Sequence, residues 1–377
     1  MSFVLKNAKL VLSEEIVDGS VNVDDGIIRS ISSGDHSAGE DCEGDYLMPG
    51  IVELHTDNLE RHIVPRPAAI WPNMFASVVT HDAEVACSGI TTVFDSLRLG
   101  AIQGEQLPHA KLFPKMLSAL AEAVDSGMLR AHHLLHLRLE LTDPGLMDLL
   151  SNHADFPLLK LISLMDHTPG QRQWQDIDAL RRHSSRGIRS AEEVETMIQL
   201  RIEAGNQHVP QNRRAVLSYL KNRELTLASH DDTTLEHIEE AVADKVSISE
   251  FPCSLEAASA AKKAGMFTLG GAPNVVRGGS HSGNVNMHEL LDRALLDGLS
   301  SDYVPASLLQ AVFQLVEQKQ WSLPEATKLV TANTASMVGL TDRGVIAEGK
   351  RADLIRVRLV NGCPCVRSVY VSGHRVA

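Results

Sequence analysis

The fold that we predict for this chain follows from the segment Pro49-Gly50-Ile51-Val52-Glu53-Leu54-His55-Thr56-Asp57. A short apolar run delivers a His and an Asp, two residues apart, at the point where a strand would end. Residues i and i+2 of a strand point the same way. Two ligand-type side chains at the carboxyl end of a strand are typical of a barrel enzyme, so the stretch predicts the beginning of a metal site in a barrel.

The middle of the chain repeats this arrangement. Short apolar runs alternate with amphipathic helical segments, which indicates βα units and a parallel sheet. Eight runs are candidate strands: Ile51–His55, Thr91–Asp95, His133–Glu140, Leu158–His167, Leu225–His230, Val246–Phe251, Phe267–Gly271 and Gly298–Asp302. They predict an α/β fold, a closed (β/α)8 TIM-type barrel over residues 51–340. A doubly wound open sheet is the alternative, but no glycine-rich phosphate loop follows the first strand.

A polar, charged segment interrupts the barrel pattern at about residues 171–215. It follows the fourth strand, where a long insertion often covers the site. We therefore expect a helical insertion there, placed as a lid.

The two ends of the chain carry short alternating strands instead of βα units. Residues 1–50 contain three such runs, and Asp25-Gly26 is a hairpin turn signal. Residues 341–377 are similar. Neither end has enough strands to close a core by itself. We expect one small composite β-sandwich domain from residues 1–50 plus 341–377, with the barrel inserted between its two parts.

Composition limits the class of protein. The chain has 377 residues, 44% of them hydrophobic and 22% charged, which is typical of a globular protein. Neither a membrane-length apolar run nor a signal-peptide pattern is visible, so we expect a cytoplasmic protein with no membrane partner. The net charge of −13 argues against nucleic-acid binding. The five cysteines are scattered and odd in number, which indicates reduced thiols. A homo-oligomer stays possible.

Six potential metal ligands lie at the predicted strand ends, where their side chains would converge on the carboxyl mouth of a barrel. They are His55, Asp57, Glu140, His167, His230 and Asp302. Imidazole plus carboxylate is the ligand set of zinc or manganese, and six ligands suffice for two ions. The cofactor that we expect is one or two Zn2+, with Mn2+ as the alternative.

Each candidate residue could also have a structural role that involves neither metal binding nor catalysis. His167 and His230, taken singly, are more often structural or solvated. Glu140 could instead pair with Arg138, and His81-Asp82, at the head of a predicted helix, could cap it. The joint pattern is stronger than any one member, because the His or acidic residue recurs at one register in separate βα units.

A second group of residues suggests an anion site. The glycine-rich stretch after the seventh strand lets backbone N–H groups approach a ligand closely. Other loops on the same rim add arginines, whose guanidinium forks suit phosphate oxygens. The candidate substrate-binding residues are Arg66, Arg172, Arg277, Ser280, His281 and Asn284. They favour a small phosphorylated substrate, although a mobile connection and solvated surface arginines are the alternatives.

Several phrases resemble the amidohydrolase superfamily. They are Pro49-Gly50 before the first-strand His, Gly89-Ile-Thr-Thr-Val, and Arg343-Gly-Val-Ile-Ala-Glu-Gly-Lys-Arg-Ala-Asp-Leu-Ile. More narrowly, the whole chain is similar to the PhnM family of the carbon–phosphorus lyase pathway. The phrases that carry this likeness include Ser163-Leu-Met-Asp-His-Thr-Pro-Gly-Gln-Arg-Gln, Ala228-Ser-His-Asp-Asp and Gly271-Ala-Pro-Asn-Val-Val-Arg-Gly-Gly-Ser-His-Ser-Gly-Asn.

This resemblance implies a metal-dependent diphosphatase of phosphonate catabolism. Such an enzyme cleaves alpha-D-ribose 1-methylphosphonate 5-triphosphate to the 5-phosphate and pyrophosphate. Asp57 stands where the superfamily usually has the second His of His-x-His, and Glu140 is preferred over Lys160 as the bridging ligand. The resemblance makes Asp302 and His230 the catalytic residues, with Asp302 also moving the proton of water.

Two other functions stay open from the sequence. One is a C–N hydrolase or deaminase of the same superfamily that acts on an anionic small molecule, because a fold does not decide a function. The other is a non-catalytic subunit of a phosphonate-degrading assembly. An intact set of six ligands argues against the second, since a scaffold need not keep convergent metal-binding side chains.

Overall fold

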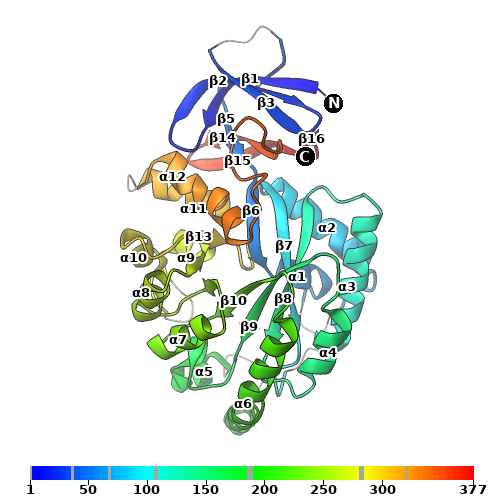
Figure 1. The fold of residues 1–377 in the computed structure, drawn as a ribbon, viewed down its shortest axis with the longest axis vertical. Coiled ribbons are helices and arrows are strands. Elements are labelled where there is room, and N and C mark those ends of the chain that lie inside the picture. The colour runs from blue at the N-terminus through cyan, green and yellow to red at the C-terminus, as the bar shows by residue number, and fades with distance from the viewer. Residues whose placement is uncertain are drawn as a thin grey trace.

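The computed structural model describes residues 2–34, 38–66, 69–105, 109–184, 190–279, 284–318 and 321–377. Figure 1 shows a barrel at one end of the molecule and a separate sheet, holding both termini, at the other. In the part of the chain that is described, every helix is too short or too polar to cross a membrane.

Eight parallel strands form the barrel, in the order in which they occur along the chain. They are β6 (Ile51–Thr56), β7 (Ile90–Leu99), β8 (His132–Glu140), β9 (Leu159–Met165), β10 (Thr226–His230), β11 (Ile248–Glu250), β12 (Phe267–Gly271) and β13 (Gly298–Ser300). A bridge between Thr56 and Asp302 brings the last strand back to the first. All eight strands lie where the sequence predicts them, so the fold class is confirmed.

The barrel strands are apolar because both of their faces are covered. Phe94, Leu134, Leu161, Ala228 and Ile248 come from five consecutive strands and pack in one buried cluster. A second cluster fills the space between strands and outer helices, where Leu135 and Leu137 meet side chains from the helix that follows β7. The two clusters hold the strands in register, and their carboxyl ends therefore share one mouth.

Helices follow most of the barrel strands and surround them (Figure 1). They are α1 (Asn58–Ile63), α2 (Met74–Cys87), α3 (His109–Asp125), α4 (Leu146–His153), α5 (Ile177–Ser184), α6 (Ala191–Leu220), α7 (Leu235–Ala243), α8 (Leu255–Lys263), α9 (Ala272–Arg277), α10 (Met287–Asp292), α11 (Ser307–Glu317), α12 (Leu323–Lys328) and α13 (Ala332–Met337). Polar residues begin several of them, as in α7, where the Thr234 hydroxyl accepts from the His237 N–H.

Helices occupy the predicted insertion after β9. A short 3-10 helix (Arg172–Trp174) is followed by α5 and by the 30-residue α6. Helix α6 begins with a capping box between Ser190 and Glu193. Near its other end, Val216 and Leu220 are buried in the outer core, so this half of α6 covers the barrel wall.

The strands of the two termini form one sheet of eight strands. They are β1 (Ser2–Val11), β2 (Ile16–Asp24), β3 (Ile27–Ser33), β4 (Glu40–Asp41), β5 (Tyr46–Pro49), β14 (Leu354–Val360), β15 (Cys363–Val371) and β16 (His374–Arg375). The two ends of the chain meet where β5 pairs antiparallel with β14. This is the composite β unit expected from the sequence.

Pro49-Gly50 connects this sheet to the barrel with no intervening loop, because β5 ends at Pro49 and β6 begins at Ile51. The space at Gly50 is very small: a Cβ atom there would lie 2.2 Å from the Oγ1 atom of buried Thr91. Glycine is therefore required for the close approach of β6 to the start of β7.

The predicted capping role of His81-Asp82 is wrong. Both residues are buried in the middle of α2, whose N-terminal cap is Asn73. The helix begins seven residues before His81, and the His81 Nε2 atom instead lies 2.7 Å from Asp95 Oδ1 on β7. His133 on β8 contacts the other oxygen of Asp95, also at 2.7 Å. These residues form a charged network outside the barrel wall.

Candidate functional site

A cavity of about 510 Å³ opens at the carboxyl ends of the barrel strands. Five of the six predicted metal ligands line it: His55, Asp57, His167, His230 and Asp302. They come from β6, from the loops after β6, β9 and β13, and from β10, so the common register of the strands brings together residues far apart in the sequence. The structure thus places these five side chains around one mouth, and their role as metal ligands stays a prediction.

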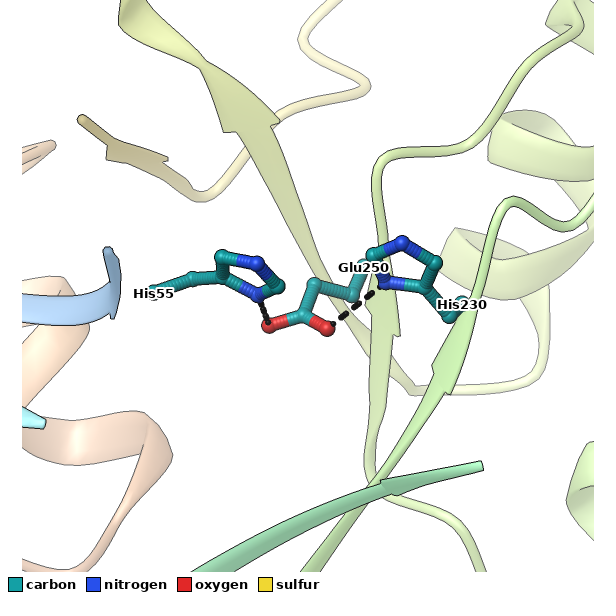
Figure 2. A group of neighbouring side chains, drawn as sticks. All are labelled: His55, His230 and Glu250. Carbon is teal, nitrogen blue, oxygen red and sulfur yellow. Dashed lines mark hydrogen bonds and ion pairs between the residues drawn. The ribbon is translucent and has the colours of Figure 1, made fainter. Parts of the chain in front are cut away.

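Glu250, at the end of β11, lies between two of these imidazoles (Figure 2). Its Oε1 atom is 2.8 Å from His55 Nδ1, and its Oε2 atom is 3.0 Å from His230 Nδ1. The potential ligand atoms of the three residues all lie within 4.8 Å of one another. On its other side, Nε2 of His230 is 3.4 Å from Asp231 Oδ2, so this imidazole connects two carboxylates.

The donor set suits a divalent cation. Although His55 Nδ1 and Glu250 Oε1 are close, neither atom takes part in a hydrogen bond, and Asp57 Oδ1 is also buried without a partner. Burial, reinforced by the charge of Arg138, holds the pKa of His55 well below its ordinary value, so the imidazole is neutral. Neutral imidazole nitrogens and carboxylate oxygens that are not engaged in hydrogen bonds can serve as ligands for zinc or a similar ion.

Glu140 does not line the cavity, but it holds His167. Its Oε2 atom lies 2.5 Å from His167 Nδ1, and its Oε1 atom accepts from the Thr142 hydroxyl at 2.6 Å. Burial favours the neutral acid, yet the adjacent His167 outweighs burial and lowers the pKa of Glu140. The alternative pairing of Glu140 with Arg138 is not what the structure shows.

Three aspartates at the mouth have raised pKa values. Burial raises the pKa of Asp302 to about 7, and the charge of Asp57 adds to this effect. Burial likewise raises the pKa of Asp57 to about 6 and that of Asp231 to about 6. A carboxyl group that titrates near neutral pH is suited to proton transfer, and a nearby cation would bring each group back to its charged form.

The backbone is strained around the same mouth. Asp231, Phe251 and Asp302 lie just past β10, β11 and β13, and their φ angles are 56°, 54° and 54°. Residues other than glycine rarely adopt this left-handed region, and for a bulky side chain such as Phe it is an outlier. Strain of this kind persists where the surrounding structure requires it, commonly at functional sites.

The predicted anion-binding residues separate into distinct groups. Arg277 and Asn284 line the cavity, whereas Arg66 is exposed and outside its lining. Arg172 is a correction: it is buried and its Nη1 atom donates to Asp232 Oδ1 and to the His230 carbonyl, so it supports the β10 turn and does not face the cavity. Ser280 and His281 lie outside the described residues.

Sequence reasoning missed three residues of the site. Glu250 ends a predicted strand, so the rule that found His230 could have found it. Asp231 follows His230 directly and lines the cavity. Arg138 also lines the cavity, two residues before Glu140, but a single Arg within an apolar strand has no distinctive pattern. Lys160, the other possible bridging ligand, is exposed on the outer face of β9.

Comparisons with known proteins agree with this architecture. Residues 46–376 match the Amidohydrolase family. The chain is 40% identical to the alpha-D-ribose 1-methylphosphonate 5-triphosphate diphosphatase of Escherichia coli (strain K12), over 99% of this chain and 100% of the relative. Among solved structures, N-acetylglucosamine-6-phosphate deacetylase from Pasteurella multocida is similar (TM-score 0.66, 11% identity, covering 100% of this chain and 99% of that one).

A dihydropyrimidinase from Brevibacillus agri is also similar, with a TM-score of 0.61 and 13% identity, covering 100% of this chain and 95% of that one. At these identities the two structures bear on the fold alone. The family match, by contrast, spans the whole barrel and the C-terminal strands, and the relative is similar from end to end. This chain therefore belongs to the amidohydrolase family.

Proposed function

We propose that this protein is a metal-dependent diphosphatase that hydrolyses alpha-D-ribose 1-methylphosphonate 5-triphosphate to the 5-phosphate and pyrophosphate, in phosphonate catabolism. The observation that carries the proposal is the 40% identity to the Escherichia coli enzyme of that name, which extends over 99% of this chain. A cavity that combines potential metal ligands with Arg277 agrees with a phosphorylated substrate.

The proposed metal ligands are the six residues predicted from the sequence: His55, Asp57, Glu140, His167, His230 and Asp302. We add Glu250, because it contacts both His55 and His230. One or two Zn2+ ions fit this donor set, with Mn2+ as the alternative. A divalent ion bound there would lower the pKa of water and offset the charge that develops on the phosphoryl group.

Side chains of the protein accept the proton, position the reacting group and bind the phosphoryl groups. Asp302 accepts the proton of the attacking water, since a cation held in the site would keep this carboxyl group charged and able to accept a proton. The water oxygen bonds to phosphorus as the bridge between the first and second phosphoryl groups breaks, and pyrophosphate leaves. His230 is held by Glu250 beside the reacting group, while Arg277 and Asn284 bind the outer phosphoryl groups.

The test is an assay of pyrophosphate release from the ribosyl triphosphate, with metal analysis of the freshly purified protein. We expect stoichiometric pyrophosphate, a bound divalent ion, and loss of activity on chelation that zinc or manganese restores. Release of ammonia or an amine from an anionic substrate, without pyrophosphate, would favour a C–N hydrolase or deaminase. Protein with neither metal nor activity would favour a non-catalytic subunit. A cytoplasmic location and a homo-oligomer stay predictions.

A further inference from the structure

We propose that Arg138 forms a phosphoryl-binding subsite inside the cavity, next to the metal ligands and separate from the Arg277 position at its rim. The inference rests on the proposed function, because it assigns a residue to the triphosphate of that substrate. Nothing in the sequence pattern or in the comparisons gives Arg138 this role.

The placement of Arg138 follows from the alternation of β8. His136, Arg138 and Glu140 are two residues apart and therefore share one face of the strand. His136 lies in the barrel interior, where its Nε2 atom is 2.9 Å from the Ser163 hydroxyl of the next strand, and Glu140 holds His167 at the mouth. Arg138, between them, lines the cavity together with His55 and Asp302.

Arg138 is half-buried, and its lack of a carboxylate partner is unusual beside the other buried or half-buried arginines. Arg172 is bound by Asp232, Arg213 by Asp244, and Arg356 by Asp45. Arg98, which faces Arg138 across β7 and β8, is bound by Glu105. Among the described residues, Arg138 makes no hydrogen bond or ion pair with a carboxylate. Its Nε atom is buried without a partner, as are those of Arg98 and Arg172, so the missing carboxylate is what sets Arg138 apart.

The charge of Arg138 acts on the whole site. Its positive charge opposes the rise that burial causes in the pKa of Asp57, Asp231 and Asp302, and it adds to the fall that burial causes in the pKa of His55 and His230. Arg138 lines the same cavity as Asp57, Asp231 and Asp302, so its side chain shares that space with these groups. The guanidinium is thus within reach of a ligand that contacts the metal residues.

An arginine of this kind is suited to an anion. Partly burying a cation without a partner costs free energy, and a protein normally supplies a carboxylate, as it does for Arg98 and Arg172. A phosphoryl group brings the missing charge with the substrate, and its oxygens match the planar fork of the guanidinium. Because Arg277 is exposed, the two arginines can bind successive phosphoryl groups at two depths, with Arg138 on the group nearest the metal residues.

The experiment measures binding of an imido-bridged tripolyphosphate, which resists hydrolysis, to the metal-loaded protein by calorimetry. We expect Arg138→Gln to weaken binding by about 10- to 100-fold, the usual loss for a charge-assisted contact. Arg138→Lys should recover part of the affinity, because it keeps the charge without the fork. Arg98→Gln is the matched control and should bind as the wild type does, since Glu105 already neutralises Arg98.

Thermal unfolding of the metal-loaded variants, with Arg172→Gln added, distinguishes a loss of ligand affinity from a loss of protein stability. Arg138→Gln should melt no lower than the wild type, whereas Arg172→Gln should melt lower because it leaves the carboxylate of Asp232 buried without its cation. Wild-type affinity in Arg138→Gln, or no binding by the wild type, would overturn the subsite. The proposed function fails by a different result, namely absence of pyrophosphate release by the wild type.

Discussion

Asp302 and His230 are the residues on which the proposed chemistry depends most. We predict that Asp302→Ala and His230→Ala each lower kcat by about 10²- to 10⁴-fold, the usual contribution of a positioned proton-transfer group, or more if metal is also lost. Asp302 is a buried carboxyl group whose pKa burial already raises, so its removal should not unfold the protein. Steady-state kinetics and circular dichroism of both variants test this, and full activity in either variant would remove that residue from the mechanism.

Arg277 tests the rim of the cavity separately. It is exposed and lines the opening, so its guanidinium can contact phosphoryl oxygens that are still partly solvated. We predict that Arg277→Ala raises KM by about tenfold, with a smaller effect on kcat, because the lost contact exists before the reaction starts. Unchanged kinetics would reduce the glycine-rich loop to a connection.

Metal binding should depend on pH through the aspartates of the mouth. The pKa of Asp302 is raised to about 7 and that of Asp57 to about 6, so both carboxyl groups take up protons as the pH falls through this range. Protons then compete with the cation for the same oxygens. Zinc affinity of the metal-free protein should therefore fall between about pH 8 and about pH 5, and titration with a competing chelator measures it. An affinity independent of pH would exclude both aspartates as ligands.

At the scale of elements, the charged network between α2, β7 and β8 fastens a helix to the barrel wall. Burial opposes the charge of His133, yet the carboxylates of Asp95 and Asp82 outweigh burial and raise its pKa to about 9. The stability that His133 contributes is fully present below the unfolded pKa of about 6.5 and is lost as the pH rises through about 9. We predict that the free energy of unfolding falls by about 2–4 kcal/mol across this window.

Urea unfolding at several pH values measures this effect, with His133→Gln as the control. The variant lacks the titrating imidazole, so its stability should change much less between neutral pH and about pH 9.5. An equally steep fall in the variant would assign the pH dependence to other groups.

The junction of β5 and β6 makes a prediction about packing. A Cβ atom at Gly50 would lie 2.2 Å from Thr91 Oγ1 and 2.4 Å from Thr91 Cγ2, and Thr91 is buried. Gly50→Ala should therefore destabilise the protein by about 1–3 kcal/mol, as overpacking of a core does. A fluorescence-monitored denaturation curve tests this. Gly44→Ala is a comparison in which the added Cβ atom meets no neighbour, although the φ of +75° at Gly44 adds backbone strain. An unchanged denaturation midpoint in Gly50→Ala would show that Thr91 moves aside.

The same elements show what could be read from the sequence. The eight strands could be predicted because each is a short apolar run bounded by polar residues. The predicted metal ligands that line the cavity are those at or just past strand ends. The proposed role of Arg138 could not be predicted from the sequence, because it rests on the absence of a carboxylate partner, which only the packed structure reveals. The capping role of His81-Asp82 was wrong since a helix start cannot be placed without knowing that Asn73 caps α2. Arg172 was misplaced because a loop arginine gives no sign of its carboxylate.

In the whole molecule, the terminal sheet and the candidate site lie at opposite ends of the barrel. The terminal sheet lies at the end of the barrel where β6 begins, and the cavity lies at the opposite, carboxyl ends of the strands. The barrel supplies every described residue of the site. Arg356 and Asp45 instead join the two halves of the terminal sheet, with Nε and Oδ2 2.5 Å apart. Changes in that sheet should thus alter stability before they alter the mouth.

The pairing of β5 with β14 also has a consequence for synthesis on the ribosome. Strand β5 ends at Pro49 and its antiparallel neighbour begins at Leu354, so the residues between these two positions must all be translated before that edge is covered. At about 5–20 residues per second, the wait is on the order of 15–60 seconds. During this interval the nascent chain exposes an unpaired strand edge, which makes it a natural substrate for chaperones at the exit tunnel.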